Sequence, residues 1–492
     1  MIVPFSVTDF IARATSVYAE RVGVVDEPDQ PATSWGDVTY GRVGELARAQ
    51  AARLDAMGIG VGERVAYVSH NSARLLTAFF GVCGSGRVLV PINFRLSPGE
   101  VAYIVKHSGA RVLFVDPELT ESLADVTAEH TFVIGDDDAY LFDTEPQPWE
   151  PDENATATIN YTSGTTARPK GVQVTHRNIW TNAVTFALHA GVTDRDVYLH
   201  TLPMFHCNGW GMPFAMTGMG VPHIVLRKID GAEILRRVAK HGVTVMCAAP
   251  AVVAAVLDAA QTWEGEIPGR DRVRIIVAGA PPPTKTVARV RAELGWEFIQ
   301  IYGLTETSPL LTVNRMRSEW DDLTPEEQAT RLVRAGQPVI GCTVRRRRHR
   351  LPVVVVLTID DQHLQRFGSP GRPRDPQAPQ SEEPDHHHAL RERQHRVSPG
   401  CSFSESIDPP CQEGACERLR SQRASGGNRG DPGIGVESSP RCPWSRSTIA
   451  GIPKYDNAGR GTDRAVQFSS WTPMRDPHPS RIFLGPERGR GP

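Results

Sequence analysis

The fold class is decided by three short apolar runs: RVAYVS at Arg64–Ser69, RVLVPI at Arg87–Ile92 and RVLFVD at Arg111–Asp116. Each run has the length and the valine-rich composition of a strand that is buried on both faces. Residues 72–82 and 98–107, which lie between these runs, have the apolar spacing of helices. Strands that alternate with helices predict βαβ units and a largely parallel sheet.

The same alternation continues to about residue 344. Further strands are predicted at Asp196–Thr201, His223–Leu226, Val243–Ala248 and Arg274–Ala278, with helices at Ala232–His241 and Thr284–Leu294. The string SPGE at Ser97–Glu100 has the pattern of a capping box with proline at the first helical position, which fixes one helix start. We therefore expect an α/β domain over residues 1–344, made of two doubly wound α/β subdomains and an incomplete β-subdomain. Doubly wound sheets bind ligands at the carboxyl ends of their strands.

The composition of the whole chain excludes several classes of protein. Of its 492 residues, 40% are apolar and 22% are charged, as in a soluble globular protein, and the net charge of −2 indicates neither nucleic acid nor an anionic membrane as a partner. Eight cysteines without a C-x-x-C pair argue against a disulfide framework, a zinc knuckle or a redox dithiol. Residues 1–23 lack the pattern of a signal peptide, and no apolar run is long enough to span a membrane. We expect a cytoplasmic protein, and no residue pattern specifies an oligomeric state.

The chain changes character at residue 345. Residues 346–492 contain 22 arginines, one lysine and 18 of the 39 prolines, and they lack apolar periodicity from residue 368 onward. Such a segment buries too little apolar surface to offset its chain entropy, so we expect residues 345–492 to be largely disordered. A basic nucleic-acid arm is the weaker interpretation, because aromatic residues are not interleaved. A metal site at His386–His388 is weaker than adventitious binding, because no second ligand cluster accompanies it.

The most informative motif is YTSGTTARPKGV at Tyr161–Val172, which follows a strand-like run at Ala155–Asn160. Its hydroxyl side chains and its lysine can donate to phosphate oxygens, and its first glycine lets the backbone approach a phosphate closely. The candidate phosphate-binding residues are Thr162, Ser163, Gly164, Thr165, Thr166 and Lys170. The alternative is a polar surface turn. A P-loop NTPase or a kinase is a weaker choice, because a Walker loop has glycine before its lysine and Pro169 stands there instead.

The string resembles the signature phosphate loop of the adenylate-forming superfamily, which includes acyl-CoA synthetases, firefly-luciferase-like enzymes and the adenylation domains of peptide synthetases. Other landmarks of that family follow in order. LPMFHCNGW at Leu202–Trp210 resembles the acyl-pocket segment, Gly279–Pro281 resembles the turn that lies against adenine, and QIYGLTET at Gln300–Thr307 resembles the second signature. The resemblance covers about residues 5–344.

This resemblance implies that the chain activates a carboxylic acid with ATP to an acyl-adenylate and then makes an acyl-CoA thioester with coenzyme A. It implies that Tyr302 stacks near adenine, Thr305 contacts the α-phosphate, Glu306 ligates Mg²⁺ and His206 lies at the pocket mouth. Further nucleotide contacts are implied for Gly279, Ala280, Pro281, Gln300 and Gly303. Taken alone, Glu306 would be a helix N-terminal acid and His206 a structural histidine.

The chemistry itself requires cations. A carboxylate that attacks the α-phosphorus brings two anions together, so Lys170 and a magnesium ion must offset the charge of the transition state. We therefore expect the segment that ends in PKG at residues 169–171 and the segment that ends in Thr305-Glu306 to meet around one magnesium–triphosphate.

The acyl-pocket segment favours a fatty acid or another organic acid. Amino-acid-activating relatives usually place an aspartate there, whereas HCNGW at His206–Trp210 contains no acid, and an unpaired substrate ammonium would be costly to bury. HCNGW resembles short- and medium-chain acyl-CoA ligases in particular. Trp210 would close a shallow pocket and disfavour long tails.

The resemblance stops within RAGQPVIGCTVR at Arg334–Arg345, which resembles the run of the family into its β-subdomain. We find no counterpart of the ribose-binding Thr-Gly-Asp, of the Asp-Arg-x-Lys hinge or of the lid motif Pro-x-Thr-x-x-Gly-Lys, and Lys454 lacks that context. The abrupt switch resembles a reading-frame shift in a GC-rich gene. We therefore expect weak ATP binding and little ligase activity. Two alternatives stay open: a non-catalytic nucleotide- or acyl-binding pseudoenzyme, and an acyl-AMP ligase that passes the acyl group to a carrier protein.

Overall fold

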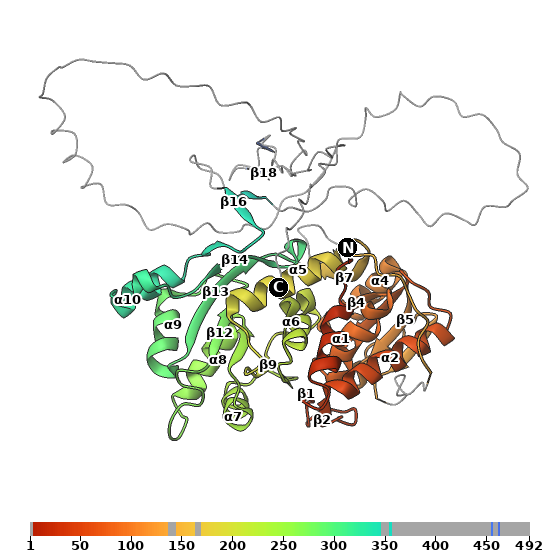
Figure 1. Cartoon of the computed structure of the whole chain (residues 1–492), viewed down its shortest axis with the longest axis horizontal. Coiled ribbons are helices and arrows are strands. Elements are labelled where there is room, and N and C mark those ends of the chain that lie inside the picture. Colours follow the sequence, from red (N-terminus) through yellow and green to blue (C-terminus); the bar gives the residue numbers. More distant parts are fainter. Residues whose placement is uncertain are drawn as a thin grey trace, which may run out of the picture. The chain divides into compact units, whose positions relative to one another are not determined.

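The computed structural model describes residues 3–135, 144–162, 169–345, 354–356, 454–455 and 461–462. The chain divides into two compact units, Met1–Thr343 and Val344–Pro492. The first unit contains two α/β subdomains that lie side by side, each a sheet flanked by helices (Figure 1). The expected fold class is therefore confirmed for this unit.

The amino-terminal subdomain is built on a six-stranded sheet with the strand order β6-β5-β3-β4-β7-β8. Its strand pairs are parallel except the last, in which β8 runs back antiparallel to β7. The strands are β3 (Arg64–Val68), β4 (Val88–Ile92), β5 (Ala110–Val115), β6 (His130–Val133), β7 (Thr156–Thr162) and β8 (Lys170–Thr175). All five residues of β4 are buried, as in a parallel sheet that helices cover on both faces.

The second subdomain is built on a nine-stranded sheet with the strand order β15-β14-β13-β12-β11-β9-β10-β1-β2. The six strands from β13 to β1 are parallel, and antiparallel strands extend the sheet at both edges. The strands are β1 (Val22–Val25), β2 (Asp37–Thr39), β9 (Tyr198–His200), β10 (His223–Val225), β11 (Val245–Ala248), β12 (Arg274–Val277), β13 (Glu297–Gly303), β14 (Leu310–Asn314) and β15 (Gln337–Pro338). The first strand of the chain thus belongs to the second sheet, which interlocks the two subdomains.

Helices connect and cover the strands. They are α1 (Thr8–Val17), α2 (Tyr40–Ala56), α3 (Ala73–Gly81), α4 (Pro98–Ser108), α5 (His176–Ala190), α6 (Met212–Met219), α7 (Gly231–His241), α8 (Pro250–Ala260), α9 (Thr284–Arg289) and α10 (Pro325–Leu332). Short helical turns are η1 (Cys83–Ser85), η2 (Pro117–Leu119), η3 (His206–Gly211), η4 (Val290–Leu294), η5 (Thr305–Thr307) and η6 (Ser318–Trp320). No helix of the described part of the chain is long and apolar enough to cross a membrane.

The local signals in the sequence account for most of these elements. The predicted capping box is confirmed: the Ser97 side chain accepts from the Glu100 backbone N–H, and the Glu100 carboxylate accepts from the Ser97 N–H at 2.9 Å. Two expectations need correction. The helix predicted at Thr284–Leu294 ends as an α-helix at Arg289 and continues as a five-residue π-helical turn. Antiparallel edge strands also follow the parallel cores, because short connections such as those around residues 304–309 return the chain directly.

Buried polar contacts join the carboxyl ends of the two sheets. The Asn71 side chain, which follows β3, donates to the backbone oxygens of His200, Leu202 and Leu226 and accepts from the Met204 N–H at 2.8 Å. These partners belong to the second subdomain. The two sheets are therefore fixed against each other by an asparagine that has four hydrogen bonds.

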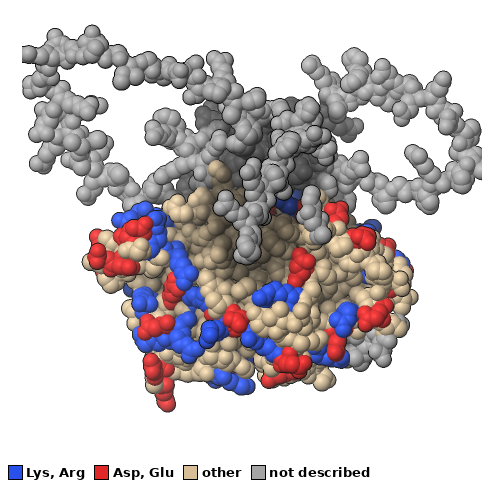
Figure 2. Space-filling model, viewed as in Figure 1, with Lys and Arg blue, Asp and Glu red and all other residues tan. Residues whose placement is uncertain are grey.

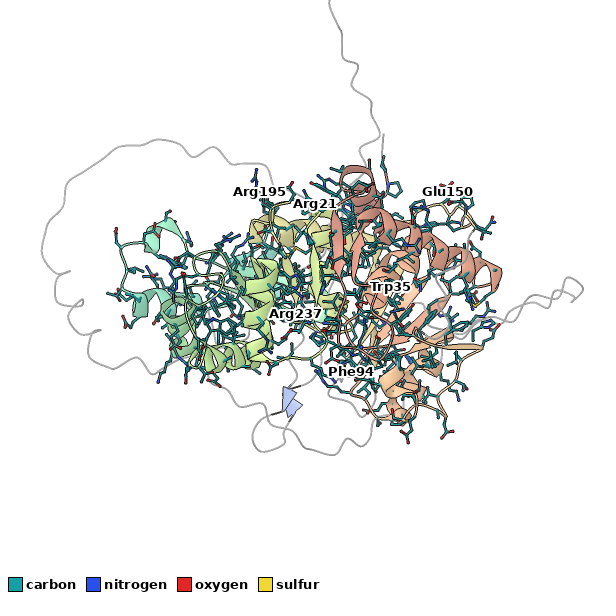
Figure 3. The ribbon with its side chains drawn as sticks, turned by 90° about the horizontal axis from the view of Figure 1, so that it is seen from below. Arg21, Trp35, Phe94, Glu150, Arg195 and Arg237 are labelled. Carbon is teal, nitrogen blue, oxygen red and sulfur yellow. The ribbon has the colours of Figure 1, made fainter. Side chains whose placement is uncertain are left out.

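Two buried ion pairs lie at this edge of the sheets, of which the first joins the two subdomains and the second lies within the second subdomain. Arg227, after β10, pairs with Asp116, after β5, at 2.6 Å, and Arg237 of α7 pairs with Glu27, after β1, at 2.7 Å. Burial opposes ionisation of Asp116, but the hydrogen bond and charge of Arg227 outweigh it and lower the pKa of that carboxyl. Arg237 is labelled on the green part of the ribbon in Figure 3. A buried pair of this kind fixes geometry, since moving either partner leaves an uncompensated charge.

The second unit is described only in part. Its strands β16 (Thr343–Arg345) and β17 (Val354–Val356) form one two-stranded sheet, and β18 (Lys454–Tyr455) and β19 (Gly461–Thr462) form another. The other residues from 346 to 492, His386–His388 among them, lie outside the described residues. The expected disorder of residues 345–492 therefore stays a prediction.

A pair of buried histidines should make the fold sensitive to acid. His200 Nε2 lies 2.9 Å from His223 Nδ1, and His223 Nε2 lies 3.0 Å from the Thr217 hydroxyl. Burial lowers the pKa of His223 from 6.5 to about 3 and lowers the pKa of His200 as well. The unfolded chain binds more protons below its pKa of 6.5, so stability present above pH 6.5 is lost as the pH falls towards 3.

Replacing His223 with glutamine should reduce this loss. We expect the pH slope of the free energy of unfolding between pH 4 and 6 to decrease by about 1.4 kcal/mol per pH unit, the contribution of one proton. Denaturant titrations at several pH values measure the slope. The matched control is His130→Gln, on edge strand β6, where the ring is one-third exposed. An unchanged slope in the His223 variant would contradict the assignment.

Candidate active site

The predicted site residues lie at the carboxyl ends of the two sheets. Thr162 ends β7 of the first sheet. In the second sheet, His206 follows β9, Gly279–Pro281 follows β12, and Thr305-Glu306 follows β13. The carboxyl ends of parallel strands are the edge at which doubly wound sheets bind ligands. The fold therefore collects motifs that are as far apart in the sequence as Thr162 and Glu306 on one edge of each sheet.

The phosphate motif forms the tip of a β-hairpin. Thr162, the last residue of β7, pairs directly with Lys170, the first residue of β8. Ser163, Gly164, Thr165 and Thr166 lie between them and fall outside the described residues. Lys170 is exposed and Thr162 is half-buried, so the hairpin holds the lysine at the open edge of the sheet. A strand that begins at this lysine was not predicted from the sequence.

Gly171 keeps the hairpin closed. A Cβ atom at this position would lie 2.8 Å from Ile159 Cγ2 and 3.1 Å from Tyr161 Cζ, on the opposite strand. The Tyr161 hydroxyl in turn contacts His107 Nδ1 at 2.8 Å, and burial raises the pKa of this phenol to about 12. Neutral Tyr161 thus anchors the base of the phosphate loop to helix α4.

The Thr305-Glu306 segment meets this hairpin. Cα atoms of β8 and of η5 lie within 8 Å of one another. Thr305 is half-buried and Glu306 is exposed, so the carboxylate is free to face solvent or a cation. The structure therefore places the strand that Lys170 begins close to the turn of Glu306. That the two segments share one magnesium–triphosphate stays a prediction.

The turn that carries Thr305-Glu306 is closely packed. Its Thr307 hydroxyl accepts from the Leu304 N–H at 2.9 Å, and a Cβ atom on Gly303 would lie 1.8 Å from the Pro309 carbonyl oxygen. That distance is inside the van der Waals radii of the two atoms, so only glycine fits at position 303.

The expected adenine-side residues surround the ends of β12 and β13. Gly279 has φ +97° and, with Ala280 and Pro281, forms an exposed turn after β12. Gln300 is buried, whereas Tyr302, two residues further along β13, is 40% exposed. An exposed aromatic ring next to an exposed glycine turn is suited to stacking against a planar base. Gln300 pairs with Val277 of β12 in the sheet, and its side-chain Oε1 atom is buried without a hydrogen-bond partner.

The acyl-pocket segment contains an unusual left-handed turn. Cys207, Asn208, Gly209 and Trp210 have φ values of 47°, 53°, 56° and 61°. A left-handed turn costs about 1–2 kcal/mol for each residue with a side chain, so it persists only where the surroundings hold it. The left-handed turn was not predicted from HCNGW.

Buried asparagines on neighbouring strands and turns hold this segment. Asn160 of β7 donates to Asn208 Oδ1 at 3.0 Å, and Asn208 donates to the Thr158 hydroxyl at 2.9 Å. The Thr158 hydroxyl donates to Asn160 Oδ1 at 3.1 Å, which closes a ring of three side chains. Sequence reasoning missed this ring; the signal was a row of polar residues, Thr158 and Asn160 among them, at alternate positions of the strand.

The left-handed turn also contacts the Thr305-Glu306 segment. Burial raises the pKa of the Cys207 thiol to about 12, a hydrogen bond with Thr305 opposes that rise, and the charge of Glu306 adds to it. His206 precedes Cys207 and is partly in contact with solvent, and burial by nearby protein atoms lowers the pKa of its imidazole. Three separate segments therefore meet: the lysine hairpin, the Thr-Glu turn and the acyl-pocket turn.

The residues fit a magnesium ion that is shared with phosphate. Among the described residues, no group of three His, Cys, Asp or Glu side chains could hold a metal ion alone. Mg²⁺ bound to a nucleotide keeps several waters and takes only one or two protein carboxylates. The exposed Glu306 carboxylate beside the half-buried Thr305 hydroxyl supplies such a donor set.

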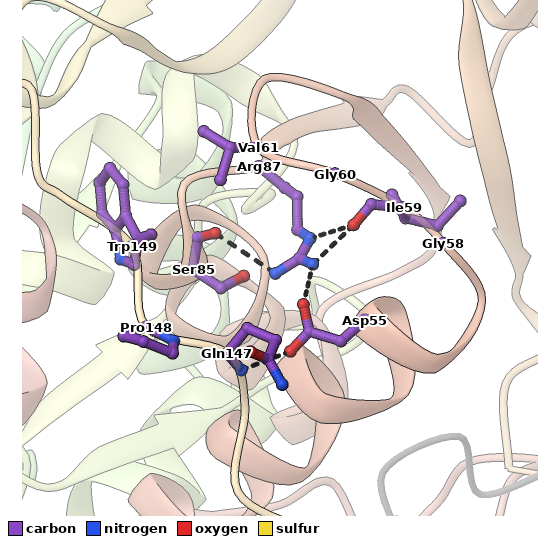
Figure 4. Close-up of a pocket in the computed structure, with 10 residues that line it drawn as sticks. All are labelled: Asp55, Gly58, Ile59, Gly60, Val61, Ser85, Arg87, Gln147, Pro148 and Trp149. Atoms are coloured by element: carbon purple, nitrogen blue, oxygen red, sulfur yellow. Dashed lines mark hydrogen bonds and ion pairs between the residues drawn. The ribbon is translucent and has the colours of Figure 1, made fainter.

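A pocket of about 310 Å³ lies elsewhere, near the amino ends of β3 and β4 (Figure 4). Its one arginine, Arg87, is saturated by the protein: it donates to the carbonyl oxygens of Ile59 and Ser85 and pairs with Asp55. None of the predicted site residues lines this pocket. It is separate from the candidate active site.

Comparison with known proteins agrees with the fold. Residues 14–347 match the family described as AMP-binding enzyme, and the chain belongs to that family. It is 34% identical over 355 residues to 4-hydroxybutyrate–CoA ligase 2 of Metallosphaera sedula, which covers 68% of this chain and 63% of that protein. It is also 34% identical over 350 residues to the long-chain-fatty-acid–CoA ligase of Thermus thermophilus, with 67% and 63% covered.

A solved structure shares the fold at similar coverage. The o-succinylbenzoate CoA synthetase of Bacillus subtilis, in complex with the acyl-adenylate intermediate OSB-AMP, matches with a TM-score of 0.59 and 26% identity, over 69% of this chain and 66% of that one. The matched part of the chain spans 63% of the length of each of the two ligases.

Gly303→Ala should disrupt the Thr-Glu turn. We expect ATP binding to weaken at least tenfold, because the new Cβ would overlap the Pro309 carbonyl and displace the turn that carries Thr305 and Glu306. Isothermal titration with ATP and Mg²⁺ measures the change. Gly99→Ala, in helix α4 where a Cβ would meet nothing within 4 Å, is the control. Equal affinities for ATP in the two variants would contradict the role given to the turn.

Proposed function

We propose that this chain derives from an acyl-CoA ligase that activates a fatty or other organic acid with ATP to acyl-AMP and then transfers the acyl group to coenzyme A. The observation that carries the proposal is the meeting of three segments, with β8 against η5 and Cys207 against Thr305 and Glu306. Family membership over residues 14–347 supports the same class of reaction.

Each site residue would have a role that follows from its charge or its hydrogen-bonding groups. Lys170, exposed at the start of β8, would hold phosphate oxygens, together with the hydroxyls of the phosphate loop. Thr305 would donate to the α-phosphate, and Glu306 would ligate Mg²⁺. The magnesium ion, when bound, would neutralise phosphate charge and orient the leaving pyrophosphate. Tyr302 would stack on the adenine, while Gln300 and the Gly279–Pro281 turn would border it.

His206 would stand where the carboxylate enters. It lies at the start of the left-handed turn, and its pKa is lowered by loss of hydration. A neutral imidazole at neutral pH can donate one hydrogen bond to the carboxylate without pairing it as a fixed cation, which leaves the carboxylate nucleophilic.

The substrate would be a carboxylic acid whose tail carries no charge. The left-handed turn contains no carboxylate to pair with an ammonium, and Trp210 is 6% exposed, so its indole occupies interior space. We therefore propose a short- or medium-chain acid. The two relatives described above act on acids of different length, 4-hydroxybutyrate and long-chain fatty acids, and do not distinguish these cases.

Nucleic acid is not part of the proposal. The net charge is −2, and on the face drawn in Figure 2 basic and acidic side chains are interspersed instead of forming a patch of one sign. The partners proposed are the carboxylic acid, ATP with Mg²⁺, and coenzyme A.

Two alternatives share the site but not the whole reaction. A pseudoenzyme would bind nucleotide or acyl group without turnover, and an acyl-AMP ligase would pass the acyl group to a carrier protein. The sequence of residues 346–492 lacks the ribose and lid motifs of the family, which favours low activity over full activity. ATP–pyrophosphate exchange separates a pseudoenzyme from both ligases, because only an adenylating enzyme catalyses exchange.

Removing Lys170 should lower the rate of exchange, whereas removing the Glu306 carboxylate should raise the requirement for Mg²⁺. We expect Lys170→Ala to lower exchange by about 10²–10³-fold, the usual loss for one preorganised donor to developing charge. We expect Glu306→Gln to raise at least tenfold the Mg²⁺ concentration needed for half-maximal exchange. Lys240→Ala, exposed in the last turn of α7, is the control for the lysine. Exchange that survives Lys170→Ala intact would remove that residue from the mechanism.

This chain should be a slow ligase. Enzymes commonly turn over at about 1–10³ per second. Without the ribose and lid motifs we expect acyl-CoA formation below about 0.1 per second, since lid closure excludes water and completes the site. Turnover with acids of two to sixteen carbons measures both rate and preference. Full-rate thioester formation would overturn the first expectation, and a clear preference for palmitate would overturn the proposed chain length.

A further inference from the structure

We infer that Asn182 is a positioning residue that couples the acyl-pocket turn to the Thr305-Glu306 turn. This inference rests on the proposed function, because it assigns those two turns to one acyl-adenylate site. Asn182 lies in the second turn of helix α5 and is 7% exposed.

Each end of the Asn182 side-chain amide is bonded to a different segment. Nδ2 donates to the Trp210 carbonyl oxygen at 3.2 Å, and Oδ1 accepts from the Leu310 N–H at 3.1 Å. Trp210 is the last residue with a side chain in the left-handed turn, and Leu310 is the first residue of β14. One buried side chain therefore joins two backbone segments that lie 100 residues apart in sequence.

The two hydrogen bonds of Asn182 lie next to the segments that carry the proposed site residues. Leu310 ends the connection that begins at Gly303 and contains Thr305 and Glu306, and the tight packing of Gly303 on the Pro309 carbonyl makes this connection move as a unit. On the other side, Gly211 follows the left-handed turn with φ +83°, and a Cβ atom there would lie 2.4 Å from Asn182 Nδ2. The amide thus packs directly against the backbone of the acyl-pocket turn.

Helix α5 also connects Asn182 to the phosphate hairpin. The helix begins directly after β8, the strand that Lys170 starts, and a capping box between Thr175 and Asn178 fixes this junction. Helix α5 is therefore connected to all three segments: it follows the strand of Lys170, and Asn182 bonds it to the acyl-pocket turn and to the end of the Thr-Glu connection. The distance between the acyl half and the phosphate half of the site depends on an asparagine that touches neither reacting atom.

Binding of two adenylate ligands tests this coupling. AMP occupies only the nucleotide half, whereas 5′-O-(N-butanoylsulfamoyl)adenosine, a stable acyl-adenylate analogue, occupies both halves. In Asn182→Ala we expect the affinity advantage of the analogue over AMP to fall at least tenfold, while AMP binds within about threefold of the original chain. A merely structural defect would weaken both ligands in the same proportion.

The variant Asn182→Asp adds a readout that loss of structure would not give. An ionised aspartate still accepts from the Leu310 N–H but repels the Trp210 carbonyl, whereas a protonated aspartate donates to that carbonyl and restores both bonds. We therefore expect its affinity for the analogue to recover as the pH is lowered from 8 to 6, with little change for the original chain. Thr181→Ala, at the exposed neighbouring position of the same helix, is the matched control.

The outcomes separate the two claims. If the original chain binds neither AMP nor the analogue, the proposed function itself fails. If it binds the analogue more tightly than AMP and Asn182→Ala keeps that advantage, only the coupling role is refuted. A lost advantage together with recovery of the aspartate variant at low pH would support the role.

Discussion

The structure depends on the junction that holds the carboxyl ends of the two sheets face to face. Asn71 bonds to three carbonyl oxygens and one N–H of the second subdomain, and the Asp116–Arg227 and Glu27–Arg237 pairs are buried beside it. Desolvation makes such pairs modest net stabilisers, but breaking one costs about 3–5 kcal/mol because a charge is left unpaired. That cost is a large part of the roughly 5–15 kcal/mol by which a domain is stable. The two subdomains therefore move little against each other at this junction, and the candidate site beside it is rigid for the same reason.

A second consequence is that no subdomain contains the site alone. The phosphate hairpin belongs to the first sheet, the Thr305-Glu306 turn to the second, and helix α5 leads from the first to pack against η3 and β14 of the second. Because β1 and β2 join the second sheet before the first sheet is built, the chain crosses between the subdomains more than once. The site is thus assembled by the topology, and its precision depends on the contacts at these crossings.

The sequence predicted the parts of this arrangement that local rules govern. Valine-rich runs and a capping box located β3, β4, β5 and α4 within one or two residues, because burial on both faces and helix capping are local signals. The ordered motifs predicted which segments meet. It did not predict that Lys170 starts a strand, since the hydroxyl-rich string has the composition of a loop and its pairing with β7 is a tertiary contact. Nor did it reveal Asn71, Asn160 or Asn182, each of which has a hydrogen-bond partner more than 40 residues away.

The left-handed turn shows why such partners matter most at the site. Cys207, Asn208 and Trp210 occupy a backbone region that costs each about 1–2 kcal/mol, so their own sequence does not favour the conformation. The cost is offset by the ring of Thr158, Asn160 and Asn208, in which every side chain is hydrogen-bonded away from water, where such bonds are strongest. A turn held by its neighbours has one shape before any ligand arrives. The left-handed turn is therefore held as much by β7 and α5 as by its own residues. Under the proposed function, substrate preference should follow changes in those two elements.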